Sequence, residues 1–137
     1  MTLPLQKEER HRLQSCHNEE LIKEKCFSDG INQTSLKYND WLVTIAFYIA
    51  LHHIQTFLSK NNFKSTFVSH TERNEYLKYL AQIDNRIDKI VDKYLSLYKF
   101  SRLCRYTPCY FAYLKPADVQ DYVNFSVNLL PNELKIL

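Results

Sequence analysis

The chain has 137 residues, of which 45% are hydrophobic and 24% charged, and its net charge is +3. This length suits a single globular domain over residues 1–137 and leaves little room for a second. The single glycine, Gly30, excludes glycine-rich phosphate loops and the dinucleotide fingerprint, because each needs several glycines at fixed spacing. Hairpin turns also depend on glycine, so the composition predicts an all-α protein.

Two helices are expected in the first half of the chain. Residues 6–26 are polar with a narrow apolar stripe, and that helix should end near Gly30. Asp40 can cap a second helix over residues 41–58, which is apolar on nearly all sides. Its interior His, Gln and Thr residues favour a buried central helix over a membrane span, so no membrane contact is expected.

Three more helices follow. Ser69 and Glu72 have the spacing of a capping box and mark the start of the third helix. The fourth begins near Asp84, carries apolar residues at three- and four-residue spacing, and should stop before Pro108. A last helix is predicted over residues 116–130, with Pro116 in its first turn.

The cysteines give no sign of a metal site. Cys16, Cys26, Cys104 and Cys109 lack the two-residue spacing of structural zinc ligands. The N-terminal residues do not resemble a signal peptide, so we expect free thiols and a cytoplasmic protein. Neither a metal nor a cofactor is predicted.

Several short motifs together resemble the HEPN superfamily of nucleotide-binding helical domains, over about residues 38–128. The motifs are Asp40-Trp41, Thr44-x-Ala46-Phe47-Tyr48-x-Ala50-Leu51-His52, Ser69-His70-x-x-Arg73-Asn74 and Tyr98-x-x-Ser101-Arg102-x-x-Arg105-Tyr106. His17-Asn18-Glu19 is similar to a segment of small stand-alone bacterial and archaeal members. The resemblance implies an up-and-down bundle of four to five helices that forms a homodimer in RNA-processing, defence or toxin–antitoxin systems.

Many HEPN proteins are metal-independent ribonucleases, with an Arg and a His four to six residues later at the dimer interface. The Arg would hold the scissile phosphate and the His would transfer protons. In the corresponding region this chain has Arg102 and Arg105, but no His follows His70. Tyr106 is a poor substitute because its ordinary pKa lies near 10. The usual ribonuclease motif is therefore not intact.

Two histidines remain as candidate proton carriers beside Arg102 and Arg105. One is His17, which follows Arg12 at the family's spacing and is next to Asn18. These residues would have to fold back toward the other end of the chain, and otherwise His17 and Asn18 only cover the bundle. The other is His70.

Further candidate binding residues lie on three of the predicted helices. Tyr48 and His52 continue a polar stripe from Thr44, which forms either a buried network or the lining of a pocket. His70, Arg73 and Asn74 share the first turn of the third helix, where they either bind phosphate or serve as cap, ion-pair and structural residues. The fourth helix carries Tyr94, Tyr98, Arg102 and Arg105 along nearly one stripe, either as a bundle seam or as a polyanion groove with an aromatic floor.

Three functions fit these observations. The first is binding of RNA or a nucleotide, with metal-independent RNA cleavage as an extension. The second is a catalytically inactive HEPN module that binds another protein, such as an antitoxin or a nucleotidyltransferase-like partner. The third is a structural or adaptor bundle. The clustered Arg, His and Asn residues favour the first over the third, and the missing His favours the second over cleavage.

Overall fold

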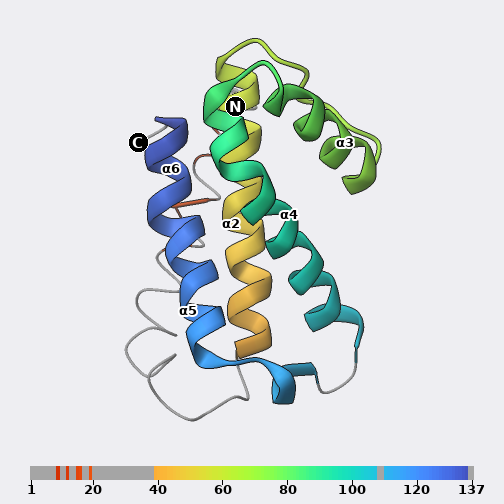
Figure 1. Cartoon of the computed structure of the whole chain (residues 1–137), viewed down its shortest axis with the longest axis vertical. Coiled ribbons are helices and arrows are strands. Elements are labelled where there is room, and N and C mark those ends of the chain that lie inside the picture. The colour runs from red at the N-terminus through yellow and green to blue at the C-terminus, as the bar shows by residue number, and fades with distance from the viewer. Residues whose placement is uncertain are drawn as a thin grey trace, which may run out of the picture.

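The computed structural model describes Glu9, Arg12, Ser15, Cys16 and Glu19, and then residues 39–107 and 110–135. Within these parts the chain consists of helices and connecting turns, without a strand. The helices run up and down beside one another around a central helix, α2 (Figure 1). The prediction of an all-α bundle is therefore confirmed. Most of the expected helix over residues 6–26 lies outside the described residues.

The central helix α2 spans Asn39–Lys60 and contacts both halves of the bundle. It lies between α4, Asn85–Tyr106, and the C-terminal helices α5 and α6 (Figure 1). Among the described helices it is the one that is long and apolar enough to cross a membrane, yet 78% of its apolar window is buried inside the bundle. This burial is what the sequence predicted for residues 41–58. Trp41 is an exception, with 62% of its surface exposed.

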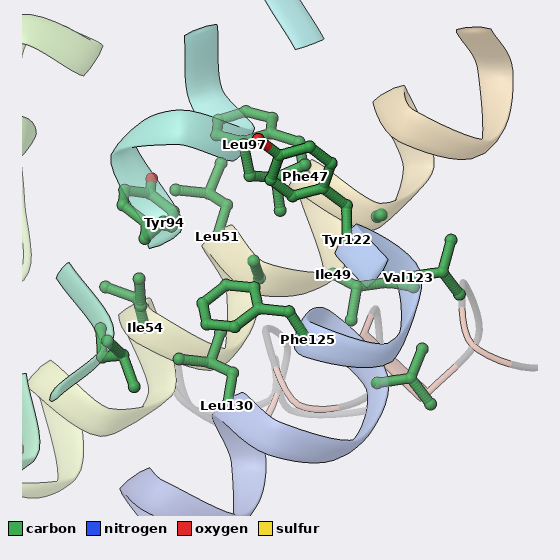
Figure 2. Close-up of a cluster of buried hydrophobic side chains, with 14 of the residues drawn as sticks. Phe47, Ile49, Leu51, Ile54, Tyr94, Leu97, Tyr122, Val123, Phe125 and Leu130 are labelled. Carbon is green, nitrogen blue, oxygen red and sulfur yellow. The ribbon is translucent and has the colours of Figure 1, made fainter. Parts of the chain in front are cut away.

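The hydrophobic core forms where α2 meets α4 on one side and the C-terminal helices on the other. Figure 2 shows part of it, with Phe47, Ile49, Leu51 and Ile54 from α2, Tyr94 and Leu97 from α4, and Tyr122, Val123, Phe125 and Leu130 from the C-terminal segment. Full burial of a large apolar side chain stabilises the fold by about 1.5–3 kcal/mol. Tyr94 is the largest of the fully buried side chains, and burial raises its pKa.

The helix α3, His70–Ala81, packs against α4 and begins at the predicted cap. The Ser69 hydroxyl accepts a hydrogen bond from the Glu72 amide at 3.1 Å. The Glu72 carboxylate accepts from the Val68 amide at 2.8 Å and pairs with Lys64 at 2.6 Å. In a capping box this carboxylate would accept from the Ser69 amide, but here it accepts from the amide of Val68, one residue earlier, and also bonds Lys64 in the preceding loop. The capping prediction is correct for the hydroxyl and wrong for the carboxylate's partner.

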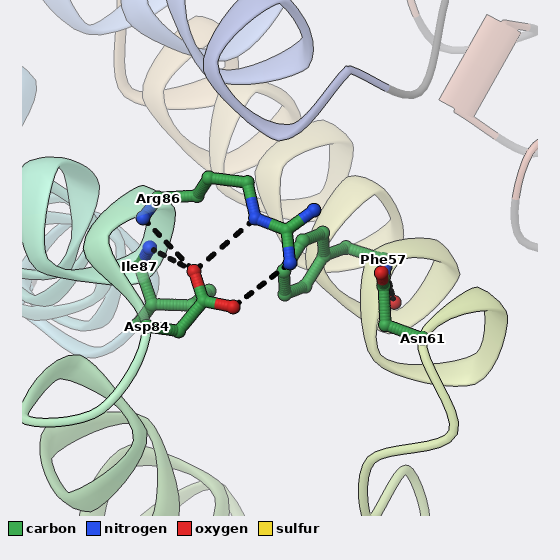
Figure 3. Close-up of polar contacts among 5 residues, drawn as sticks. All are labelled: Phe57, Asn61, Asp84, Arg86 and Ile87. Carbon is green, nitrogen blue, oxygen red and sulfur yellow. Dashed lines mark hydrogen bonds and ion pairs between the residues drawn. The ribbon is translucent and has the colours of Figure 1, made fainter.

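The helix α4 starts at Asp84, which caps it with its side chain (Figure 3). One carboxylate oxygen accepts from the amides of Arg86 at 2.9 Å and Ile87 at 3.4 Å. The Arg86 guanidinium bonds both oxygens of Asp84 and lies 4.6 Å above the centre of the Phe57 ring. Asp84 therefore caps α4 and also pairs with Arg86, whose contact with Phe57 links the first turn of α4 to α2. At the other end α4 stops at Tyr106, as predicted, and Thr107 is already extended.

The C-terminal segment continues as one helical rod beyond the predicted end at residue 130. It consists of α5, Pro116–Asn124, a π-helical turn η4, Phe125–Leu129, and α6, Leu130–Leu134 (Figure 1). Pro131 would normally interrupt a helix because it has no amide to donate. The wide π turn precedes Pro131 and interrupts the regular hydrogen-bond ladder there, so the rod continues past the proline. A short 3-10 turn η3, Tyr110–Tyr113, connects α4 to this rod.

The described part of the N-terminal region contacts α2 through His53. This histidine is 2% exposed, and its Nε2 lies 3.0 Å from the Ser15 hydroxyl and 3.0 Å from a Glu19 carboxylate oxygen. In the structure, this side chain is buried within the chain itself.

Candidate functional site

The candidate functional site lies where the first turn of α3 meets the last turns of α4. His70 and Arg73 come from α3, and Arg102 and Arg105 come from α4. The two helices are connected by a short turn and pack side by side, which brings the start of α3 toward the end of α4 (Figure 1). Ring contacts between His70 and Tyr98, with centroids 5.5 Å apart, join the two helices here. We call His70, Arg73, Arg102 and Arg105 the cationic cluster.

Arg102 is exposed and lies against two tyrosine rings. Its Nη1 donates to the Tyr98 hydroxyl at 3.1 Å, and its guanidinium lies 5.9 Å from the Tyr98 ring centre and 5.7 Å from that of Tyr106. The hydrogen bond that Arg102 donates to the Tyr98 hydroxyl raises the pKa of Arg102. Among the described residues the Tyr98 hydroxyl uses one of its donors, which leaves the others available to an anion.

Arg105 is half-buried and connects α4 to α2. Its Nη1 donates to the Tyr48 hydroxyl at 2.9 Å, and its Nε donates to the Ser101 carbonyl at 3.2 Å. The guanidinium also lies within 6 Å of the ring centres of Phe47, Tyr48 and Tyr106. Tyr48 from the predicted polar stripe is thus part of the site, and it acts by orienting an arginine.

The rest of the predicted stripe behaves differently. The Thr44 hydroxyl donates to the Asp40 carbonyl at 2.9 Å, so the backbone of α2 itself satisfies it. His52 is half-buried and has an interaction partner. Of this stripe, Tyr48 bonds Arg105 of the cationic cluster, whereas Thr44 bonds the backbone of its own helix.

His70 is held as a neutral imidazole within the cluster. Its ring is tilted by 60° against that of Phe47, with centroids 5.7 Å apart, and its Nδ1 lies 3.0 Å from Arg73 Nη1. Burial lowers the pKa of His70, and the charges of Arg73, Arg105 and Arg102 lower it further. Because arginine can only donate, Nδ1 must be the acceptor, which places the proton of the neutral ring on Nε2.

Arg73 is held by side chains that carry no charge. With the Gln55 amide oriented to satisfy its neighbours, its oxygen accepts from Arg73 Nε at 2.7 Å and Nη2 at 3.2 Å. The Gln55 nitrogen then donates to the Ser65 carbonyl at 2.8 Å, and the Arg73 guanidinium lies 5.4 Å above the Phe67 ring. The alternative in which a carboxylate pairs with Arg73 is therefore wrong for the described residues.

No carboxylate among the described residues forms an ion pair with Arg73, Arg102 or Arg105. Arg86, by contrast, pairs with Asp84. Asp40 shares a small pocket with Arg105 but makes no ion pair with it. Like charges so close repel one another unless an anion lies between them. The arrangement therefore favours binding of an anionic ligand.

A groove between α3 and α4 opens beside the cluster and has a volume of about 610 Å³. Its polar and aromatic lining includes Asn74, Lys78, Tyr98, Lys99, Arg102 and Tyr106. Lys78 pairs with Glu75 at 3.1 Å, whereas Lys99 and Arg102 have no ion pair in the described parts. The groove thus combines positive charge with the ring of Tyr106, which is 70% exposed.

The structure brings most of the predicted site residues together. His70, Arg73, Arg102, Arg105, Tyr48, Tyr98 and Tyr106 are joined by the contacts above, and Asn74 lines the adjoining groove. Arg12 lies apart, because its Nε donates to Glu9 at 3.0 Å in a local pair. His17 and Asn18 lie outside the described residues, so their predicted role in rebuilding the site stays a prediction.

Sequence reasoning missed Gln55 and Phe47 as parts of the site. Gln55 is a buried amide in an otherwise apolar helix, and a buried polar group requires a partner. That rule could have identified Gln55 as a site residue, but it could not have named Arg73 as the partner. Phe47 resembled any other core residue, although its ring contacts His70, Tyr98 and Arg105.

The thiols and acidic groups of the described residues do not form a metal site. No group of three or more His, Cys, Asp or Glu side chains in these parts of the chain could hold a metal ion. Cys104 is half-buried, and burial together with the negative charge of Asp40 raises the pKa of its thiol to about 12. A thiol with so high a pKa is a poor nucleophile at neutral pH.

Comparison with known proteins adds no family or function to these observations, because no family model, curated protein or solved structure matches the chain. The motifs that resemble HEPN domains are therefore interpreted through the geometry that they adopt here.

Proposed function

We propose that this protein binds RNA or a nucleotide at the cationic cluster and the adjoining groove. The main support is electrostatic, since Arg73, Arg102 and Arg105 converge without a carboxylate partner in the described parts of the chain. Guanidinium groups bind phosphate through paired, charge-assisted hydrogen bonds. A nucleic acid would supply the negative charge that this cluster lacks.

The aromatic side chains give the proposal its second support. Tyr106 is largely exposed, and its ring centre lies 5.7 Å from the guanidinium of Arg102 and 5.3 Å from that of Arg105. Proteins that bind single strands combine cationic side chains for the phosphates with aromatic rings on which unpaired bases stack. Arg102 and Tyr106 are thus placed to bind a phosphate and its neighbouring base, which favours single-stranded RNA over a simple inorganic anion.

The same geometry argues for binding ahead of cleavage. A general base needs a free lone pair, but the acceptor nitrogen of His70 already bonds Arg73 at 3.0 Å. Cleavage through His70 would require Arg73 to turn from the histidine toward the phosphate. We therefore propose metal-independent RNA cleavage only for a bound state in which the RNA strand has drawn Arg73 away from His70.

The HEPN resemblance supplies a cellular setting for the proposal. It is supported by the order and spacing of the motifs around Tyr48, His70 and Arg102. On this basis we extend the proposal to a cytoplasmic homodimer that acts in defence or toxin–antitoxin systems.

The test is binding of a labelled single-stranded RNA, measured by fluorescence anisotropy in EDTA at several salt concentrations. Arg102→Gln should weaken binding roughly tenfold, because a charge-assisted hydrogen bond contributes about 1.5–3 kcal/mol. The slope of log K against log salt should also fall by about 0.7, the value for one lost phosphate contact to a single strand. Gel analysis of the same samples would detect cleavage.

Arg86→Gln is the matched control, because Arg86 lies on the same helix but pairs with Asp84 at the far end. This variant removes the same charge and should bind RNA within about twofold of the wild type, with an unchanged salt slope. Equal effects of the two substitutions would show that RNA binds through non-specific charge attraction and not at the cationic cluster. Absence of RNA binding by the wild type would refute the proposed function.

A further inference from the structure

Trp41 is an exposed ring at the start of a helix that is otherwise mostly buried. Its surface is 62% exposed, although it belongs to the central helix α2. It borders a pocket of about 250 Å³, which is lined by Asp40, Trp41, Thr44, Cys104 and Arg105. Tryptophan is enriched at interfaces because its ring is apolar and its N–H is polar. Its position beside an arginine of the cationic cluster makes it a candidate for ligand binding.

The pocket beside Trp41 lies next to the proposed RNA site, across the last turn of α4. The start of α2 and the end of α4 lie at the same end of the bundle (Figure 1). Arg105 lines this pocket, and its guanidinium lies 5.3 Å from the ring centre of Tyr106. Tyr106 in turn lines the groove between α3 and α4 together with Arg102. A strand that leaves the groove past Tyr106 and Arg105 therefore arrives at Trp41.

The charges beside Trp41 fit a nucleobase better than a phosphate. Asp40 and Arg105 line the pocket together, so it has one negative and one positive side chain. The carboxylate of Asp40 repels a phosphate, whereas a base is planar and uncharged. The pocket is also smaller than the sites of drug-sized ligands, which measure about 300–1,000 Å³, and this size suits a single base.

A second copy of the chain is a less suitable partner for this ring. The centre of a homodimer interface is apolar and poor in charged residues, but Asp40 and Arg105 lie directly beside Trp41. A symmetric contact around Trp41 would also bring the Arg105 residues of both copies toward each other, and like charges repel. A nucleic acid strand instead supplies negative charge for the arginines and a flat surface for the indole.

We propose that Trp41 stacks on one unpaired base of an RNA strand, next to a base that stacks on Tyr106. Arg102 and Arg105 hold the phosphates of this strand. Stacking on an aromatic ring tolerates any base sequence, because every base has a π-face. The inference rests on the proposed function and makes it more specific. Two stacked bases require a strand of at least two nucleotides, so a strand and not a free nucleotide is the ligand.

The direct test is the fluorescence of Trp41 in the wild-type protein. Trp41 is the sole tryptophan of the chain, so tryptophan emission reports on this ring alone. A base stacked on the indole quenches its emission. Titration with a labelled uridine octamer should therefore quench Trp41 in parallel with the binding that anisotropy detects. An octamer with the same sugar–phosphate chain but without bases should bind through its phosphates and leave the emission unchanged.

Substitutions of Trp41 provide a second test. Trp41→Ala should weaken binding of the uridine octamer about tenfold, because one base loses its stacking partner. It should leave binding of the abasic octamer within about twofold of the wild type, since the phosphate contacts remain. Trp41→Phe keeps an aromatic ring and should restore most of the lost affinity.

Tyr79→Ala is the matched control, because Tyr79 is 56% exposed and lies near the far end of α3. This variant also loses an exposed aromatic ring, and it should bind both octamers within about twofold of the wild type. Equal weakening of both octamers by Trp41→Ala would show a structural role for Trp41 and overturn the proposal.

The fluorescence test separates the other outcomes without relying on any variant to fold. Binding of the uridine octamer without quenching of Trp41 would overturn the base site and leave the proposed function intact. Equally strong quenching by uridine monophosphate would overturn the requirement for a strand. An emission maximum that shifts to shorter wavelength as the RNA-free protein is concentrated would show that a second copy covers Trp41, and would also overturn the proposal. No binding of either octamer would refute the proposed function itself.

Discussion

At the scale of single residues, the cationic cluster shows how neighbours change the properties of a side chain. His70 sits at the start of a helix beside Arg73, and both features are visible in the sequence. Its lowered pKa, however, reflects burial together with Arg102 and Arg105, which lie on a different helix. The sequence therefore placed His70 beside Arg73 but could not predict the protonation state of the histidine.

This environment predicts how stability changes with pH. The pKa of His70 in the folded protein is below the ordinary value of 6.5, so the unfolded chain binds a proton more readily. The free energy of unfolding should therefore fall as pH drops below about 6.5, and His70 should contribute no pH dependence above about pH 7.5. Urea unfolding between about pH 7.5 and 5.5 would measure this.

The comparison with His70→Gln isolates the contribution of His70, because glutamine keeps an acceptor for Arg73 but does not titrate in this range. The variant should lose less stability than the wild type over the same pH interval. Parallel curves for the two proteins would show that the decline arises from other histidines.

At the scale of elements, α4 depends on one residue at each end for its boundaries. Asp84 caps its first turn and holds Arg86 against Phe57, while the Thr107–Pro108 junction marks the predicted stop. Both boundaries follow from local chemistry, which is why the sequence placed them correctly. The C-terminal rod was placed less well, because the π turn that precedes Pro131 has no simple sequence signal.

Loss of the Asp84 cap should destabilise the protein measurably. Asp84→Ala should lower the free energy of unfolding by about 1–2 kcal/mol, because it frees two backbone amides and the Arg86 guanidinium. Asp84→Asn should retain part of the cap through its amide oxygen. Denaturant melts at neutral pH would measure both effects.

The stability that the Asp84 cap adds should be lost at low pH, where its carboxylate becomes protonated. The hydrogen bond from Arg86 lowers the pKa of Asp84 from its ordinary value of 3.8. The stability that the charged cap adds over Asp84→Asn should therefore be complete above about pH 5 and disappear as pH falls below 3.8. Asp88→Asn, an exposed acid in the same turn, serves as the control. A difference that persists at low pH would contradict this assignment.

At the scale of the whole molecule, α2 supports both the core and the site. Phe47 contacts the rings of Tyr94 and Tyr98 and lies beneath Arg105. Ile49 follows two residues later and points about 200° away around the helix, since each residue turns by about 100°. Both side chains are fully buried, as Figure 2 shows for the core. Of these two side chains, Phe47 is the one whose ring lies against His70 and Arg105 of the cationic cluster.

Stability and binding should therefore respond differently to changes along α2. Ile49→Ala should lower the free energy of unfolding by about 2–5 kcal/mol through the cavity that it leaves. At temperatures where this variant is folded, its RNA affinity should stay within about twofold of the wild type. Phe47→Leu should destabilise less and weaken RNA binding more, because His70, Tyr98 and Arg105 lose their common support. Thermal melts would rank the two variants by lost stability, and anisotropy titrations would rank them by lost RNA affinity. The same ranking in both measurements would contradict the prediction that Ile49 and Phe47 have different roles.

Much of the fold could be predicted because it depends on interactions within one or two helical turns. A long apolar run predicted α2 and apolar periodicity predicted α4, and Ser69, Asp84 and Pro116 marked helix starts at or within a residue of their observed positions. Asp40 was the exception, since α2 begins at Asn39. The sequence could likewise place the members of each pair in the candidate site together. His70 lies close to Arg73 along the chain, and Arg102 lies close to Arg105.

Only the tertiary structure decided which of these local groups meet. Arg105 bonds Tyr48 across 57 positions, and Gln55 holds Arg73 from another helix. Side chains on different helices come together through packing of the whole bundle, and spacing within one helix carries no information about that packing. The sequence therefore determined the helices and the candidate residues, while packing determined which residues form a common site.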